Sequence, residues 1–425
     1  MMLSSAYAIF AASAALIVGY QGLVRAIPVN PAGQVRPSSL ANGPASPASY
    51  NPANFNPAIL HIRYTQAPGK TADPAKDAFI DLTLIGPDAS PGGRRVEVNS
   101  VIFRSLLQDL YRRISRQDPM AVTSPGSSSR KLYDVLLAPV GGLLKEQSIS
   151  TLLIAVDRGL QAVPFAALTD GAQYFGEAYA FSLTPSLTLT DLDSVSTRSD
   201  DRLLALGSSR FQSLSPLPIV PEELAQISPG DHKDVRLNED FTPEVFLSQS
   251  ADPRYSRVHV ATHAEFVPGG PSKSSIYSGT GPIALDQLAK LRKKRKGVPL
   301  DLIVFSACRT ALGDPESELG FAGLALQAGS KSAIGTLWYV DDVVTSAYFV
   351  QMYRYLDSGV PKAEALQLTR YALIKGLIRV QGNEVIGVDG SALLTGLTPS
   401  QVQRMKQNTA HPFYWAGIQL LGTPW

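Results

Sequence analysis

The sequence predicts an α/β protein with a mostly parallel sheet, helices on both faces, and a small α+β unit in front of it. Short apolar runs rich in valine and isoleucine recur in the later two thirds of the 425-residue chain, and such runs are typical of buried strands in a parallel sheet. Segments with helical periodicity lie between most of these runs, and this alternation favours a largely parallel sheet. No internal repeat indicates a solenoid.

Composition limits the function classes. The chain is 44% hydrophobic and 17% charged, so it can bury one large core or two ordinary ones. Its net charge is +2, which gives no reason to expect a nucleic-acid partner. One cysteine excludes an intramolecular disulfide, and no Cys/His cluster has metal-ligand spacing. We therefore expect neither a metal nor another cofactor.

Residues 1–26 are predicted to be a signal peptide or a membrane anchor. No charged residue occurs from Ala6 to Val24, a length that fits a signal peptide or a borderline membrane span. Small residues at Val24 and Ala26 suit a cleavage site, whereas no Lys or Arg precedes the apolar region. We expect an exported or membrane-anchored protein, periplasmic or otherwise extracytoplasmic if bacterial, rather than a cytoplasmic one. Residues 6–24 would be the membrane tether.

Two further segments precede the main domain. Residues 27–57 predict a linker, because proline, alanine and asparagine dominate without apolar periodicity. Residues 58–127 predict the small α+β unit, which would act as a cap or docking module. Within this unit, residues 59–64 and 79–85 alternate with period two and predict an antiparallel pair of strands. A helix is expected to follow, with one apolar face that runs from Ile102 to Ile114.

The main domain is expected over residues 130–425. Its predicted strands are residues 151–156, 179–183, 203–206, 257–262, 302–306 and 332–337. Its predicted helices include residues 222–227, 284–291, 321–328 and 343–356.

Two predicted strands end on side chains that suit covalent catalysis. The strand 257–262 is followed by His263, and the strand 302–306 leads into Cys308. In open α/β sheets, ligands and chemistry gather outside the carboxyl ends of the strands. An imidazole and a thiol at one sheet edge are what a cysteine nucleophile and its base require. The alternative is that the lone cysteine is a small buried hydrophobe.

The main domain also resembles a known family. Several motifs occur in the family's order: Val260–His263, Ser306–Gly313, Leu337–Asp342 and His411–Gly417. Together with motifs near residues 132–139, 163–168 and 185–186, they resemble the CHAT domain, a caspase- and separase-like module of mainly bacterial proteins. The resemblance spans about residues 130–425, and it implies a caspase-like fold and cysteine peptidase activity.

The resemblance also implies roles for individual residues. His263 would be the base and Cys308 the nucleophile, which reacts as its thiolate. The backbone N–H groups of Cys308 and Ala264 would stabilise the oxyanion. Caspases and separase have glycine where this chain has Ala264, and alanine tolerates positive φ poorly.

Asp342 is the candidate for the substrate pocket. It ends a segment that resembles the separase segment whose last acid receives a substrate arginine, and a carboxylate can pair with a guanidinium through two hydrogen bonds. The alternative is that Asp341 or Asp342 caps the helix that follows. Asp301 begins the strand that leads to Cys308, so about 23 Å separates it from the thiol.

Two functions stay open on sequence alone. The first is a cysteine endopeptidase that cleaves a protein or peptide substrate, after a basic residue. The second is a catalytically silent scaffold that uses the cleft and the N-terminal unit to bind a regulatory partner protein. His259 is expected to lie in the core. The basic run Arg292–Lys296 is expected to be solvated at a helix end, with contact to an anionic membrane or a cleavage site as the alternatives.

Overall fold

The computed structural model describes residues 57–66, 76–86, 91–157, 160–187, 190, 202–227, 232–265, 271–307 and 321–425. The predicted signal peptide or anchor lies outside these residues, as does the predicted linker except for Pro57. No helix in the described part of the chain is long and apolar enough to cross a membrane.

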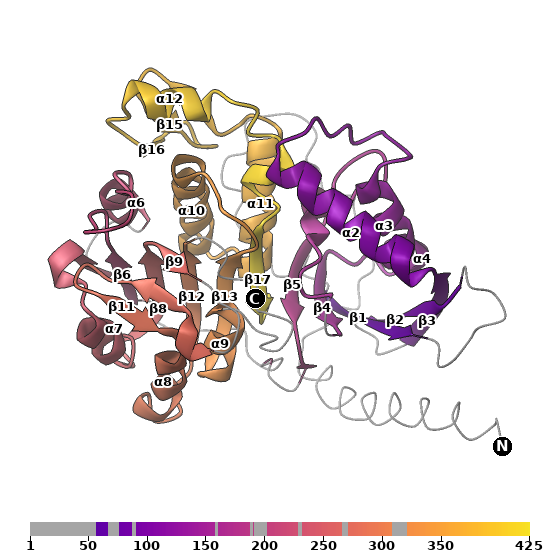
Figure 1. Cartoon of the computed structure of the whole chain (residues 1–425), viewed down its shortest axis with the longest axis horizontal. Coiled ribbons are helices and arrows are strands. Elements are labelled where there is room, and N and C mark those ends of the chain that lie inside the picture. The colour runs from indigo at the N-terminus through magenta and orange to yellow at the C-terminus, as the bar shows by residue number, and fades with distance from the viewer. Residues whose placement is uncertain are drawn as a thin grey trace.

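One large sheet organises the described residues, with the strand order β3-β2-β1-β4-β5-β17-β13-β12-β8-β6-β7 (Figure 1). The strands are β1 (Pro57–Gln66), β2 (Ala78–Ile85), β3 (Pro91–Val98), β4 (Thr151–Val156), β5 (Ala180–Thr184), β6 (Arg202–Gly207), β7 (Lys233–Leu237), β8 (Tyr255–Ala261), β12 (Leu300–Ser306), β13 (Ser330–Thr336) and β17 (Ile418–Gly422).

Neighbouring strands are mostly parallel, as predicted. Strands β7, β6, β8, β12 and β13 run in one direction. Strand β17 is antiparallel to β13 and parallel to β5, which is parallel to β4 and through it to β1. The sheet therefore contains two parallel blocks of opposite direction, β1-β4-β5-β17 and β13-β12-β8-β6-β7, which meet between β17 and β13, while β2 is antiparallel to β1 and to β3. All six strands predicted for the main domain are confirmed, with ends shifted by one or two residues.

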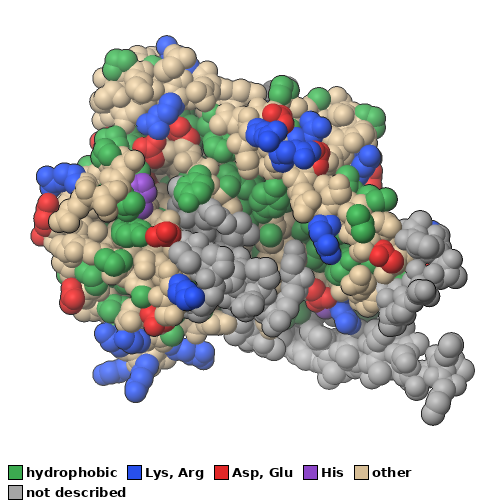
Figure 2. All heavy atoms as spheres, in the orientation of Figure 1, with side chains coloured by type: hydrophobic (Ala, Val, Ile, Leu, Met, Phe, Trp, Pro, Cys, Tyr) green, Lys and Arg blue, Asp and Glu red, His purple; other side chains and the backbone are tan. Residues whose placement is uncertain are grey.

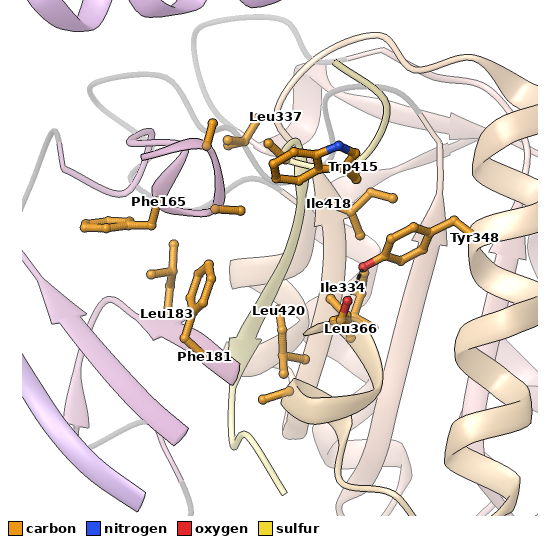
Figure 3. Packing of buried hydrophobic residues seen from close by; sticks show 14 of the residues in the cluster. Phe165, Phe181, Leu183, Ile334, Leu337, Tyr348, Leu366, Trp415, Ile418 and Leu420 are labelled. Carbon is orange, nitrogen blue, oxygen red and sulfur yellow. Dashed lines mark hydrogen bonds between the residues drawn. The ribbon is translucent and has the colours of Figure 1, made fainter. Parts of the chain in front are cut away.

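Helices cover both faces of the sheet, because successive side chains of each strand point to opposite faces. On one face, Leu302 and Val304 of β12 belong to a core that includes α6 (Val220–Gln226), α10 (Asp342–Asp357) and α11 (Lys362–Ile374). Figure 3 shows part of this core, where the Tyr348 hydroxyl of α10 points toward Leu366 of α11 and donates to its carbonyl oxygen at 3.0 Å. On the other face, Ile303 and Phe305 pack with α7 (Pro243–Gln249), α8 (Ala289–Lys294) and α9 (Phe321–Gln327).

The N-terminal unit extends the main sheet instead of forming a sheet of its own. The predicted antiparallel pair is confirmed as β1 and β2, with Ile59 opposite Ile85. On its other side β1 pairs in parallel with β4, so that Ile59 also lies opposite Leu153. Both edges of β1 are therefore hydrogen-bonded. The helices α2 (Ser100–Ser115), α3 (Ser128–Leu136) and α4 (Ala138–Glu146) cover this end of the sheet (Figure 1).

A separate segment lies between α11 and β17, and we call residues 379–405 the C-terminal excursion. It contains a small antiparallel sheet of β14 (Arg379–Gln381), β15 (Glu384–Ile386) and β16 (Ala392–Leu394), followed by α12 (Pro399–Met405). In Figure 1 the excursion lies at the top, above α10 and α6. Two hydrogen bonds join it to α6, from the Thr395 backbone N–H and hydroxyl to the Glu222 carboxylate at 2.9 and 2.8 Å.

The basic run after α8 differs from the expectation at one residue. Arg292, Lys293, Lys294 and Lys296 are exposed, and Figure 2 shows basic side chains gathered at the lower left, over α8. Arg295, in contrast, is only 3% exposed. Its guanidinium donates hydrogen bonds at 2.9 to 3.4 Å to the carbonyl oxygens of Ser250, Asp252, Tyr255, Val298 and Pro299. Its guanidinium therefore binds buried backbone carbonyl oxygens instead of facing solvent.

Candidate active site

The two strands that lead to the predicted catalytic residues are parallel neighbours. In the register of β8 with β12, Ala261 lies opposite Ser306. One residue later the ladder continues, because the Thr262 N–H donates to the Ser306 carbonyl oxygen at 3.3 Å. His263 follows Thr262 directly, at the carboxyl end of β8. Cys308 follows Ala307 in the sequence and lies outside the described residues.

His263 is held by the loop that follows β6. Its Nε2 atom lies 2.8 Å from the carbonyl oxygen of Ser215, and its ring centroid lies 4.7 Å from that of Phe211. Because a carbonyl oxygen only accepts hydrogen bonds, this contact requires a proton on Nε2. In the neutral ring, Nδ1 then carries the lone pair that can accept a proton.

Sequence reasoning missed Phe211 and Ser215. The signal for them was available, since they follow the carboxyl end of β6, and β6 pairs with β8. His263 and Cys308 were predicted from the rule that functional residues gather at the carboxyl ends of strands, which we call the strand-end rule. The same rule applies to that loop.

Ala264 lies in a short strand, β9 (Ala264–Glu265), which pairs with β10 (Ser275–Tyr277). Its φ is outside the left-handed region, so the position does not require glycine. The Tyr277 N–H donates to the His263 carbonyl oxygen at 3.0 Å. In an antiparallel ladder hydrogen-bonded and non-hydrogen-bonded pairs alternate. The N–H of Ala264, opposite Ile276, therefore points away from β10.

Helix α10 runs antiparallel to β8 across the same face of the sheet. Near the start of β8, Arg257 pairs with Asp357 at the carboxyl end of α10, at 2.9 Å. Halfway along, the His259 ring lies 5.6 Å from that of Phe349. From Phe349 the helix rises about 10 Å to Asp342, and from His259 the chain advances about 13 Å to His263. The amino end of α10 is therefore level with the carboxyl ends of the strands.

Two acids stand at that end of α10, and we call Asp341 and Asp342 the acid pair. Asp341 is the helix cap, since its Oδ1 accepts the N–H groups of Val343 and Val344 at 3.1 and 3.0 Å. Burial raises the pKa of Asp341 above its ordinary value, while the Val344 N–H and the Arg404 charge oppose that rise. The helix-cap alternative therefore applies to Asp341.

Asp342 is not the cap, and its carboxylate pairs with an arginine of α12. The Arg404 Nη1 donates to Asp342 Oδ1 and also lies 3.4 Å from Asp341 Oδ2. Asp301, at the opposite end of β12, pairs with Lys362 at 3.1 Å. Sequence reasoning identified the acids but missed Arg404, because it follows no strand of the large sheet.

A buried polar network lies under the site. His259 is completely buried, as expected for a core residue. Its Nε2 is 2.8 Å from Oε1 of Glu223 in α6, and the other oxygen of Glu223 accepts the Ser346 hydroxyl of α10 at 2.5 Å. The Nδ1 of His259 has no hydrogen-bond partner among the residues that the structure describes. Within the part of the chain that the structure describes, no cluster of His, Cys, Asp or Glu could hold a metal ion.

Comparison with known families assigns the chain. The family model for the CHAT domain matches residues 126–423. The chain belongs to the CHAT domain family. The match includes β8, β12, the acid pair and Arg404, whereas β1, β2, β3 and α2 precede it in the chain.

Solved structures and curated proteins provide the remaining comparisons for this CHAT protein. Separase in the Saccharomyces cerevisiae separase–securin complex is similar with a TM-score of 0.48 and 10% identity, over 88% of this chain and 30% of the separase chain. The Arg-specific cysteine proteinase gingipain R gives a TM-score of 0.41 and 12% identity, over 68% of each chain. This CHAT protein thus spans less than a third of the separase chain. No curated protein matches it.

Proposed function

We propose that this CHAT protein is a cysteine endopeptidase with Cys308 as the nucleophile and His263 as the base. The observation that carries the proposal is the register of β8 and β12. His263 comes two residues after Ala261, and Cys308 comes two residues after its partner Ser306. Neighbouring strands lie about 4.8 Å apart. Because His263 and Cys308 each follow the Ala261–Ser306 pair by two residues, this spacing favours contact between their side chains.

The alternation of side chains supports the same assignment. Leu302 and Val304 of β12 face the core beneath α10, and Cys308 continues this even-numbered series in the sequence. His259 and Ala261 of β8 face the same side, and His263 continues their odd-numbered series. Phe211 and Ser215, which contact His263, belong to the loop that leads into α6 on this face.

The proposed reaction uses these groups in sequence. Nδ1 of His263 takes the proton of the Cys308 thiol while the Ser215 carbonyl holds Nε2–H. The thiolate attacks the substrate carbonyl, a C–S bond forms, and the oxyanion accepts hydrogen bonds from the N–H groups of Ala264 and Cys308. The C–N bond then breaks, and the leaving amine takes the proton from His263. Water hydrolyses the thioester and restores the thiol.

We propose a preference for substrates with a basic residue at the cleaved position, since Asp342 presents a carboxylate at the level of the strand ends. A guanidinium can engage a carboxylate with two hydrogen bonds, whereas an ammonium acts as a point charge. Arginine is therefore expected to bind better than lysine.

The decisive experiment is labelling by an electrophilic peptide that ends in arginine, together with hydrolysis of a matching fluorogenic peptide. Wild type should be labelled, and Cys308→Ala and His263→Ala should lose both labelling and hydrolysis. His232→Ala is the matched control, since His232 is an exposed histidine next to β7 at the far edge of the sheet. Equal turnover by wild type and Cys308→Ala would reject the peptidase mechanism and leave the scaffold function.

Stability separates catalytic from structural roles. Cys308→Ala should leave thermal unfolding almost unchanged. A loss of about 2 kcal/mol or more would instead indicate a buried cysteine whose removal leaves a cavity.

We also propose that residues 1–26 direct export or anchor the protein in a membrane. Deletion of residues 1–26 should move the protein from the membrane or extracytoplasmic fraction into the cytoplasmic one. An unchanged distribution between these fractions would contradict this role.

A further inference from the structure

The acid pair is already occupied by a cation of the same chain. Resting on the proposed function, we propose that Arg404 controls specificity as an internal competitor: its guanidinium holds the place at Asp342 that a substrate arginine needs, and binding of that arginine requires Arg404 to leave.

The contacts make Asp342 the acid that can exchange partners. Asp341 commits Oδ1 to two N–H groups of α10, so it cannot turn away without uncapping the helix. Asp342 has no such contact. Among the described residues, Arg404 is the one side chain that pairs with it.

Electrostatics requires a cation at this place. Two adjacent carboxylates repel each other, and the partly buried Asp341 pays an additional desolvation cost when it is charged. A guanidinium relieves both effects whether it comes from Arg404 or from a substrate. The exchange therefore replaces one charge-assisted hydrogen bond with another of the same kind, and its net free energy is small.

Arg404 is also placed so that it can leave. Its side chain is 33% exposed, and its buried Nε has no hydrogen-bond partner among the described residues. Arg404 therefore loses few contacts when its guanidinium turns to solvent. A capping box between Thr398 and Gln401 stabilises the start of α12, so departure of the Arg404 side chain does not require the helix to unfold.

The first test measures binding without catalysis. In a Cys308→Ala background, the affinity for Nα-acetyl-arginine amide is measured by calorimetry with and without Arg404→Ala. If Arg404 occupies the acid pair about 90% of the time, its removal should tighten binding about tenfold. Adding Asp342→Asn should abolish that gain. Arg379→Ala, an exposed arginine of the same excursion whose side chain contacts a backbone carbonyl, should leave affinity unchanged.

The second test measures specificity with the thiol present. Arg404→Ala should lower KM for an arginine substrate about tenfold and leave KM for a neutral substrate unchanged. Arg404→Gln, which keeps hydrogen-bonding capacity near the acids, provides a second variant if thermal unfolding shows that Arg404→Ala is destabilised.

The outcomes distinguish the two proposals. Unchanged affinity in both Arg404 variants, or an equal change for arginine and neutral ligands, would overturn the role of Arg404 even if wild type is an active peptidase. Tighter, Asp342-dependent binding without hydrolysis of any peptide by wild type would support the role of Arg404 and reject the peptidase function.

Discussion

The buried network around Glu223 should make one of the largest single contributions to stability near the site. The Glu223 side chain is 2% exposed and bridges β8 to α10, since its two oxygens accept from His259 Nε2 at 2.8 Å and from the Ser346 hydroxyl at 2.5 Å. Within the described part of the chain, Nδ1 of His259 already lacks a partner. Removal of the carboxylate would therefore leave the imidazole without any hydrogen bond in the core.

We expect Glu223→Ala to lower the free energy of unfolding by about 3–5 kcal/mol. Each of the two buried donors left unpaired costs about 1–3 kcal/mol, and the deleted side chain also leaves a cavity. Breaking a buried hydrogen-bonded pair typically costs the same total. Glu223→Gln should cost less, because its amide oxygen still accepts from His259 and its NH2 group can donate to the Ser346 oxygen.

Urea unfolding monitored by circular dichroism measures the effect. The matched control is Glu222→Ala, one residue earlier in α6, which loses two hydrogen bonds from Thr395 at a partly exposed position and should cost about 1 kcal/mol. A Glu223→Ala loss below that of the control would refute the reasoning. So would strict additivity with Ser346→Ala, since residues in one network should show coupling.

The remaining predictions concern other buried groups. Arg295→Ala should lower the free energy of unfolding by about 3–5 kcal/mol, because several buried carbonyl oxygens lose their donor. As a control, Arg292→Ala at an exposed position should change the free energy of unfolding by less than about 0.5 kcal/mol. Comparable losses in the two variants would contradict this prediction. Burial lowers the pKa of His411 below 6.5, so the unfolded chain binds the proton more readily than the folded protein does. The free energy of unfolding should therefore fall as pH drops below 6.5 towards the folded-state pKa. Urea unfolding of His411→Gln should depend less on pH in this range, and a pH profile identical to that of wild type would contradict the prediction. In Gly279→Ala the new Cβ would lie 1.8 Å from a backbone oxygen, so thermal unfolding should show that the free energy of unfolding falls by about 1–3 kcal/mol or more. The control is Gly281→Ala, whose new Cβ would have nothing within 4 Å and which should be nearly neutral.

Apolar runs between helical segments predicted β4, β5, β6, β8, β12 and β13, but they missed β17, which lies between β5 and β13. Strands β4, β8 and β12 are buried almost throughout, so valine, leucine and other apolar residues predominate in them and made them recognisable, although β8 also contains Ser256, Arg257 and His259. Strand β3 was missed because it is an edge strand whose sequence contains two glycines and two arginines, and charged, irregular edges are common where pairing with other chains must be avoided.

Pairings that are distant in sequence could not be predicted. The parallel pairing of β1 with β4 joins residues about ninety positions apart, and no local pattern in either strand specifies its neighbour. The alternation in β1 correctly indicated a strand and its hairpin partner. It did not show that the second edge of β1 is also paired, and the N-terminal unit was therefore predicted only as a small α+β cap or docking module.

Some residues of the candidate site could be predicted from the strand that they follow, whereas others come from distant parts of the sequence and could not. His263 and Cys308 were selected because they follow strands, and the acid pair because it follows β13. Phe211 and Ser215 also follow a strand. Arg404 comes from the C-terminal excursion, more than sixty residues after the acids it contacts. An ion pair of this kind depends on how the excursion folds over α10, which the strand-end rule does not address.

The order of strands in the sheet sets the order in which the candidate residues lie along its carboxyl edge. Strands β13, β12, β8 and β6 are consecutive neighbours, and their carboxyl ends lead in turn to the acid pair, the cysteine segment, His263 and the loop with Ser215. His263 thus lies between β12, which leads to Cys308, and the Ser215 carbonyl, while the acid pair lies on the opposite side of β12. In the proposed peptidase, a substrate whose basic side chain reaches the acid pair would therefore extend its scissile bond towards β12, and Arg404 would control access at that end.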